Sequence, residues 1–99
     1  MSEETRVKLV GPVIRGVDDD IISAVIDAAE QDNPEREIIV DDRAGYVRIQ
    51  AEKGFVLTRQ SMAAMLGRPF QLSELEPSLV SFAGRMTTMD EKWEWALHG

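Results

Sequence analysis

The first apolar segment of the chain, LVGPVIRG from Leu9 to Gly16, contains strand-breaking residues within a run that otherwise predicts a buried strand. Pro12 has no amide hydrogen to donate, and in sheets proline is therefore confined to edge strands, strand starts and bulges. Gly11 beside it permits the close approach of another backbone or an unusual turn. We therefore predict an edge strand over residues 9–14, which resists pairing with other sheets and offers a groove and Arg15 to one partner.

The next segment has the periodicity of an amphipathic helix from about Asp19 to Gln31. Its apolar residues recur at helical spacing: Ile21, Ile22, Val25, Ile26 and Ala29. The run DDD at 18–20 suits the positive end of the helix dipole, and Asp18 or Asp19 can accept hydrogen bonds from the free amides of the first turn. We favour this role over a metal site, and we expect Pro34 to end the helix.

Three short strands are predicted next, in EIIVDD (37–42), GYVRIQA (45–51) and FVLT (55–58). In the middle strand one face carries Val47, Ile49 and Ala51, and the other carries Tyr46, Arg48 and Gln50. Because the connections between the strands are short, we predict that the three strands form an antiparallel meander.

Helical spacing returns after Arg59, with Gly67 placed for a C-cap and Pro69 just beyond it. SELE at 73–76 has the spacing of a capping box, and Pro77 is expected to limit this short helix to roughly one turn. Two final strands are predicted in SFAGRMT (81–87) and KWEWAL (92–97). In the last strand Trp93 and Trp95 lie on one face and are expected to cover the core.

The predicted order is therefore β-α-β-β-β-α-(short helix)-β-β, an α+β fold with a mainly antiparallel sheet and two main helices. A chain of 99 residues without internal repeats has room for one core. We expect a flexible N-terminal tail over residues 1–8 and a single domain over residues 9–99.

Charge and hydropathy exclude several classes of partner. The net charge is −7, and residues 1–50 hold 12 acidic against 6 basic side chains. Nucleic acid is a poor partner for such a chain, because phosphate binding needs a basic surface. No stretch approaches the ~20 apolar residues of a membrane span, and the charged N-terminus lacks the apolar run of a signal peptide. We therefore expect a cytoplasmic protein without a membrane partner.

Residues suited to catalysis are scarce. Cysteine is absent, and His98 is the only histidine, so thiolate nucleophiles, serine triads and histidine metal clusters are excluded. GPVIRG lacks the glycine spacing of a dinucleotide site, and LGRPF lacks the lysine of a phosphate loop. His98 lies next to the C-terminus, where we expect it to be exposed. We predict a protein that acts by binding, with no catalytic residues, cofactor or metal.

Six short motifs occur in an order and spacing typical of one family: VGPVIR (10–15), DNP (32–34), YVRI (46–49), LTR (57–59), LGRPF (66–70) and SFAG (81–84). On these motifs the chain resembles the small effector, or coupling, proteins of bacterial multicomponent di-iron monooxygenases. The resemblance covers residues 9–97. It is closest to the toluene and alkene monooxygenase type, and more distant to the phenol hydroxylase and soluble methane monooxygenase regulatory proteins.

The resemblance implies a non-catalytic, cofactor-free subunit that is a monomer when free. Such a subunit docks on the di-iron hydroxylase, tunes its active site and couples NADH-derived electrons and O₂ activation to hydroxylation or epoxidation of a hydrocarbon. From motif position, exposed arginines and turns beside apolar strands, we predict a partner-binding set: Val10, Gly11, Pro12, Val13, Arg15, Asn33, Arg48, Arg68 and Phe82. The alternative is a small-metabolite-sensing domain of the ACT-like kind, since helices on an antiparallel sheet can also bind a metabolite at an interface.

Overall fold

Two antiparallel sheets and the helices packed between them make up residues 8–16 and 18–97, the part of the chain that a computed structural model describes. The predicted tail, apart from Lys8, and His98 lie outside this part. The elements follow in the order β1 (Leu9–Arg15), α1 (Asp19–Asp32), β2 (Ile39–Asp42), β3 (Tyr46–Glu52), β4 (Gly54–Thr58), α2 (Arg59–Leu66), the 3-10 helix η2 (Leu72–Ser78), β5 (Leu79–Ala83), β6 (Arg85–Thr88) and β7 (Lys92–Ala96).

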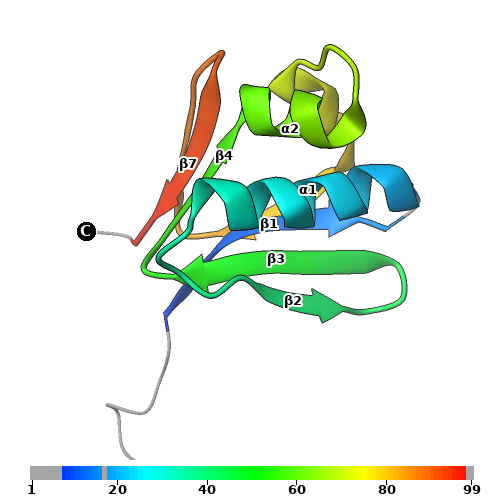
Figure 1. Cartoon of the computed structure of the whole chain (residues 1–99). Helices are drawn as coiled ribbons and strands as arrows, with labels where there is room; N and C mark the ends of the chain where they lie inside the picture. Colours follow the sequence, from blue (N-terminus) through cyan, green and yellow to red (C-terminus); the bar gives the residue numbers. More distant parts are fainter. Residues whose placement is uncertain (1–7, 17, 98–99) are drawn as a thin grey trace, which may run out of the picture.

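The larger sheet has the strand order β2-β3-β1-β5, and the smaller sheet has the order β4-β7-β6. In Figure 1, α1 lies along β1 and β3, and α2 lies on the far side of α1 from these strands. Strands β4 and β7 stand beside the two helices, and β4 contacts both of them. Both helices therefore lie on the same side of the larger sheet. The predicted α+β class is confirmed, and the elements follow in the predicted order with one additional strand after η2.

The prediction that β1 is an edge strand is wrong. β1 lies inside the larger sheet, between β3 and β5. Its register with β3 skips Gly11 and Pro12, and the Gln50 side chain donates a hydrogen bond from Nε2 to the Gly11 carbonyl at 3.3 Å. On the β5 side, Val13 opposes Ser81 and Ile14 opposes Leu79, which leaves Val80 without an opposing residue. Pro12 is tolerated in a central strand because the ladder is interrupted around it.

The predicted meander of three strands is also wrong. β2 pairs with β3, but β4 leaves this sheet and pairs with β7 along its whole length, from Gly54 opposite Ala96 to Thr58 opposite Lys92. The tight turn between β3 and β4, where Lys53 has a φ of 70°, therefore connects two different sheets. A short loop can connect two strands of one sheet or two strands of different sheets. The lengths of the loops therefore did not show that β4 belongs to the smaller sheet.

The segment predicted as one strand over residues 81–87 forms two strands, β5 and β6, one in each sheet. Gly84 lies between them with a φ of 93°. A Cβ atom at this position would lie 2.5 Å from the Ala96 carbonyl oxygen and 2.7 Å from Cγ1 of Val10. The chain therefore crosses from one sheet to the other at a position where a side chain has no room.

Local signals for the two main helices are confirmed. Asp18 caps α1 by accepting hydrogen bonds from the amides of Asp20 at 3.0 Å and Ile21 at 3.2 Å. Gly67 ends α2 in the left-handed conformation, with a φ of 71°. The capping box predicted at 73–76 is misplaced. The short helix η2 starts after Gln71, whose amide donates to the carboxylate of Glu74. η2 also includes Pro77 and extends beyond one turn.

The core fills the space between the sheets and α1. Its largest buried side chains come from both sheets, from α2 and from the segment after it: Ile14, Ile49, Phe55, Leu57, Met62, Phe70, Leu72, Leu75 and Trp95. Phe55 and Trp95 oppose each other on β4 and β7, and their rings meet edge to face with centroids 5.3 Å apart. Trp93 is also buried, which confirms that both indoles cover the core.

Candidate partner-binding surface

The face of the larger sheet that points away from α1 carries an exposed group of cationic and aromatic side chains. Tyr46 and Arg48 alternate on β3 with the buried residues Val47 and Ile49, so their side chains lie on the face opposite the core. On β1, Arg15 lies directly opposite Tyr46 and Val13 lies directly opposite Arg48. Paired residues share a face, so Arg15, Tyr46 and Arg48 form one cluster with Val13 beside them.

The two arginines of this cluster have no carboxylate partner among the residues that the structure describes. The guanidinium of Arg48 lies 5.9 Å from the centroid of the Tyr46 ring, within the range of a cation–π contact. Asp41 lies opposite Arg48 on β2, but its carboxylate pairs with Arg43 at 3.0 Å instead. The hydrogen bonds and charge of Asp41 raise the pKa of Arg43. Arg15 and Arg48 are therefore open to a carboxylate from another molecule.

An exposed apolar pair lies on β5, which is an edge strand of the same sheet. Val80 is 53% exposed and Phe82 is 45% exposed. Val80 is the unopposed residue of the interrupted ladder, and Phe82 lies opposite Pro12. Large apolar side chains on a strand edge are a feature of surfaces that meet another chain.

Four of the residues predicted for partner binding lie inside the sheet and do not present side chains on the surface: Val10, Gly11, Pro12 and Val13. Val10 belongs to the hydrophobic core. A Cβ atom on Gly11 would lie 2.5 Å from the Ile49 carbonyl oxygen, so the residue is required for the close approach of β3. The open groove was predicted from the assignment of this segment as an edge strand, and that assignment is wrong.

Asn33, another predicted partner-binding residue, is 2% exposed and connects the end of α1 to β4. Its Nδ2 donates to the carbonyl oxygens of Ala29 at 2.8 Å and Val56 at 2.7 Å. Its Oδ1 accepts from the Val56 amide at 2.9 Å. The side chain thus satisfies backbone groups on both elements, and this role belongs to the fold.

The neighbouring residue Asp32 binds the start of α2, a role that sequence reasoning missed. Its carboxylate accepts from the Thr58 amide at 2.8 Å and from Oγ of Ser61 at 2.6 Å. It also accepts from Oγ1 of Thr58, and that same oxygen caps α2 by accepting from the Ser61 amide at 3.1 Å. Asp32 and Asn33 together hold α1, α2 and β4 in one arrangement. No periodicity or spacing signal in the sequence identifies such a contact between distant segments.

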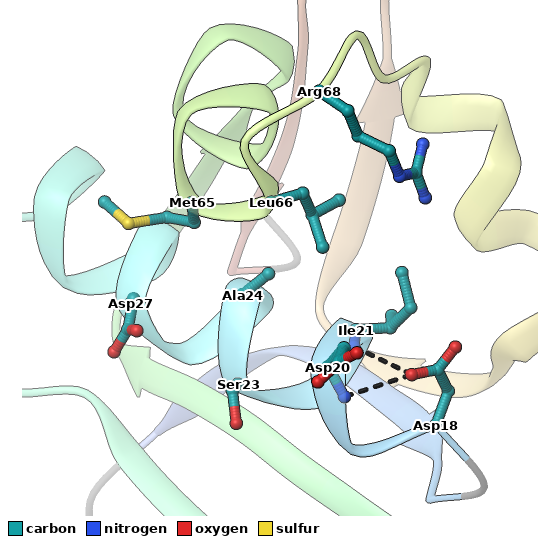
Figure 2. A pocket seen from close by; sticks show the side chains of 9 residues that line it. All are labelled: Asp18, Asp20, Ile21, Ser23, Ala24, Asp27, Met65, Leu66 and Arg68. Carbon is teal, nitrogen blue, oxygen red and sulfur yellow. Dashed lines mark hydrogen bonds between the residues drawn. The ribbon is translucent and has the colours of Figure 1, made fainter.

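Arg68 lies in the loop after α2, at a hollow of about 460 Å³ that is lined by residues of α1, by Met65 and Leu66 of α2 and by Arg68 itself. Figure 2 shows Leu66 pointing toward α1 and Arg68 reaching toward the end of α1 that carries Asp18 and Asp20. The Arg68 guanidinium lies 5.5 Å from the centroid of the Phe70 ring and 3.5 Å from a carboxylate oxygen of Glu74. Arg68 is exposed but partly engaged, and it does not lie with Arg15 and Arg48.

Among the remaining arginines, Arg59 joins α2 to the loop before β7. Its guanidinium binds the carboxylate of Glu91 at 2.9 Å, and this hydrogen bonding and charge raise the pKa of Arg59.

Within residues 8–16 and 18–97 no three acidic or histidine side chains lie close enough together to hold a metal ion. In the same part of the chain, no helix has the length and apolar character needed to cross a bilayer.

The chain matches the family described as MmoB/DmpM over residues 8–96. The chain is 46% identical over 87 residues to the effector subunit of the alkene monooxygenase system of Xanthobacter autotrophicus (strain ATCC BAA-1158 / Py2), covering 88% of this chain and 84% of that protein. It is 29% identical over 80 residues to the phenol 2-monooxygenase stimulatory component DmpM of Pseudomonas sp. (strain CF600), covering 79% and 87%.

Solved structures have the same fold. A chain from the phenol hydroxylase–regulatory protein complex matches with a TM-score of 0.74 at 30% identity, over 91% of this chain and 99% of that one. The soluble methane monooxygenase regulatory protein B matches with a TM-score of 0.65 over 99% of this chain and 74% of that one. At 23% identity, the second match concerns the fold alone.

Proposed function

The chain belongs to the MmoB/DmpM family, and from this membership we propose that it is the effector subunit of a multicomponent monooxygenase. In this role it binds the di-iron hydroxylase of the system and does not itself catalyse a reaction. It couples NADH-derived electron input and O₂ activation to hydroxylation or epoxidation of a hydrocarbon. We further propose that the free protein is a cytoplasmic monomer.

The observation that carries this proposal is the identity of 46% to an alkene monooxygenase effector subunit over 88% of the chain. A relative that similar over nearly the whole domain supports a shared fold and a related role. The likeness to a chain of the phenol hydroxylase–regulatory protein complex is consistent with a hydroxylase as partner. These comparisons favour an effector over the ACT-like metabolite sensor.

An effector of this kind acts by differential affinity. A protein that binds the competent state of its partner more tightly than other states raises the population of the competent state. A shift of ~10-fold to 100-fold requires only about 1.4 to 2.8 kcal/mol of differential binding free energy. A small chain without catalytic groups can supply that through surface contacts alone.

We propose that the direct contacts with the hydroxylase come from the exposed members of the predicted set, namely Arg15, Arg48, Arg68 and Phe82. The buried members act indirectly, by shaping the strands that carry the exposed ones: Val10, Gly11, Pro12, Val13 and Asn33. Arg15, Arg48 and Phe82 lie on the same sheet, whereas Arg68 lies in the loop after α2.

Reconstitution tests the proposed function. The hydroxylase and electron-transfer components of the source system are assayed with and without this protein, and with an unrelated acidic protein at the same concentration as control. We expect this protein alone to raise the rate of product formation and the yield of product per NADH oxidised. If neither quantity changes, the protein is not the effector of that system. Calorimetric titration with amino acids would give heat only for the ACT-like alternative.

A further inference from the structure

We propose that the cluster formed by Arg15, Tyr46 and Arg48, called here the arginine–tyrosine face, binds a pair of carboxylates on the surface of the hydroxylase. This inference rests on the proposed function, and it adds the chemistry by which the partner is recognised. It assigns the contact to the open side of the larger sheet, opposite the side covered by α1 (Figure 1).

The register of the sheet sets the spacing of the two cations. Arg15 lies opposite Tyr46, and Arg48 lies two residues further along β3, opposite Val13. Arg15 and Arg48 are therefore diagonal neighbours on adjacent strands, and such neighbours are typically about 7–8 Å apart, with a somewhat shorter distance between their Cβ atoms. Two guanidinium groups at that spacing can each bind one carboxylate through paired hydrogen bonds.

The electrostatic state of the cluster favours an external anion. The carboxylate nearest in register, on Asp41, is already bound to Arg43 at 3.0 Å. The Tyr46 ring positions the Arg48 guanidinium without neutralising its charge. The chain carries a net charge of −7, so this face is a local positive site on an acidic protein. Arginine and tyrosine are also the residue types enriched among side chains that dominate binding energy at interfaces.

Other occupants fit this face less well. In a symmetric pair of copies the same patch meets itself, which would bring four guanidinium groups together without a carboxylate. Nucleic acid binding requires a larger basic surface than two arginines on a chain of this charge. A protein surface with two neighbouring carboxylates complements the face in charge and in spacing.

The test compares charge reversals with a matched control. Arg15→Glu, Arg48→Glu and the double variant are titrated against the hydroxylase, together with Arg85→Glu. Arg85 is exposed on β6 of the smaller sheet, so its reversal changes the net charge by the same amount at a different site. We expect each single variant to weaken binding by about 10-fold or more, as for loss of a hydrogen-bonded charge pair. Arg85→Glu should change it by less than about twofold.

Two further measurements keep the outcomes distinct. Circular dichroism melting checks that the variants fold, and Arg15→Gln or Arg48→Gln replaces the reversal at the same position if that reversal does not fold. If Arg15→Glu and Arg48→Glu bind as Arg85→Glu does, while the unaltered protein binds and stimulates the hydroxylase, the face is not the contact and only this inference fails. If the unaltered protein neither binds nor stimulates, the proposed function fails. A dimer or a DNA complex that depends on Arg48, without an effect on hydroxylase binding, would assign the face to those occupants and overturn the inference.

Discussion

Asn33 and Val56, 23 positions apart in the chain, pair through two hydrogen bonds, from Asn33 Nδ2 to the Val56 carbonyl at 2.7 Å and from the Val56 amide to Asn33 Oδ1 at 2.9 Å. The side-chain amide of Asn33 thus makes the two hydrogen bonds with Val56 that a neighbouring strand would make beside β4. Because the same Nδ2 also binds the Ala29 carbonyl, one buried residue terminates α1 and fixes its distance from the smaller sheet.

Replacing Asn33 with alanine should destabilise the fold by about 2–4 kcal/mol, because the substitution leaves the backbone groups of Val56 without partners. Urea unfolding followed by tryptophan fluorescence measures this, since Trp93 and Trp95 are both buried. Gln31→Ala, on the exposed side of the same helix end, should change stability by less than about 0.5 kcal/mol. A stable Asn33→Ala variant that loses only hydroxylase binding would contradict the structural role.

Gly11→Ala should cost at least about 1 kcal/mol more than Gly45→Ala. The two glycines have nearly the same φ, 141° and 146°, so the strain that a side chain suffers from a positive φ is similar at the two positions. Only Gly11 is crowded, since its added Cβ would lie 2.5 Å from the Ile49 carbonyl oxygen, whereas Gly45 has nothing within 4 Å. Thermal melting of both variants gives the difference, and equal midpoints would exclude a steric requirement at Gly11.

Removing the Asp32 carboxylate with Asp32→Ala should lower the free energy of unfolding by about 1–3 kcal/mol, because the Thr58 amide and the Ser61 hydroxyl lose their acceptor. Asp27→Ala provides the control, since Asp27 is exposed on the same helix. Chemical denaturation compares the two. Equal stability of the two variants would mean that the contact between α1 and the start of α2 contributes nothing measurable.

Phe82→Ala should reduce the yield of product per NADH in the reconstituted system, with a change in melting midpoint that is small compared with that of Asn33→Ala. Phe82 is 45% exposed on an edge strand. Its truncation therefore removes apolar surface that a partner could contact and removes little packing from the core. Met89→Ala, at a residue 43% exposed in the loop after β6, is the matched control. An equal loss of coupling in both variants would argue against a specific contact at β5.

Sequence reasoning identified the local elements well because their signals lie within a few residues of each other. The cap at Asp18, the left-handed end of α2 at Gly67 and the burial of Trp93 and Trp95 were all predicted and are confirmed. The alternation in β3 also placed Tyr46 and Arg48 together on one face. Tyr46 was nevertheless left out of the predicted partner-binding set, although the alternation could have included it.

The pairing of the strands could not be predicted from the sequence, for a physical reason. A backbone amide of a strand can bond to any neighbour, so the residues of β4 do not encode whether β3 or β7 will lie beside them. The error in the predicted strand pairing was greatest at Gly11 and Pro12. A glycine without a side chain and a proline without an amide donor are compatible with an edge strand, and equally with a central strand whose ladder is interrupted.

The order of the main elements, the ends of the two main helices and the family resemblance followed from the chain alone, because capping, periodicity and motif spacing are local properties. Which strands pair, which residues are buried and which arginines share a face depended on contacts between distant segments. The hydrogen bond from Gln50 to Gly11, the space occupied by Ile49 and the bond between Asp41 and Arg43 exist only after the strands have come together. These contacts made Pro12 part of the interior and left Arg15 and Arg48 exposed on the open face of the sheet.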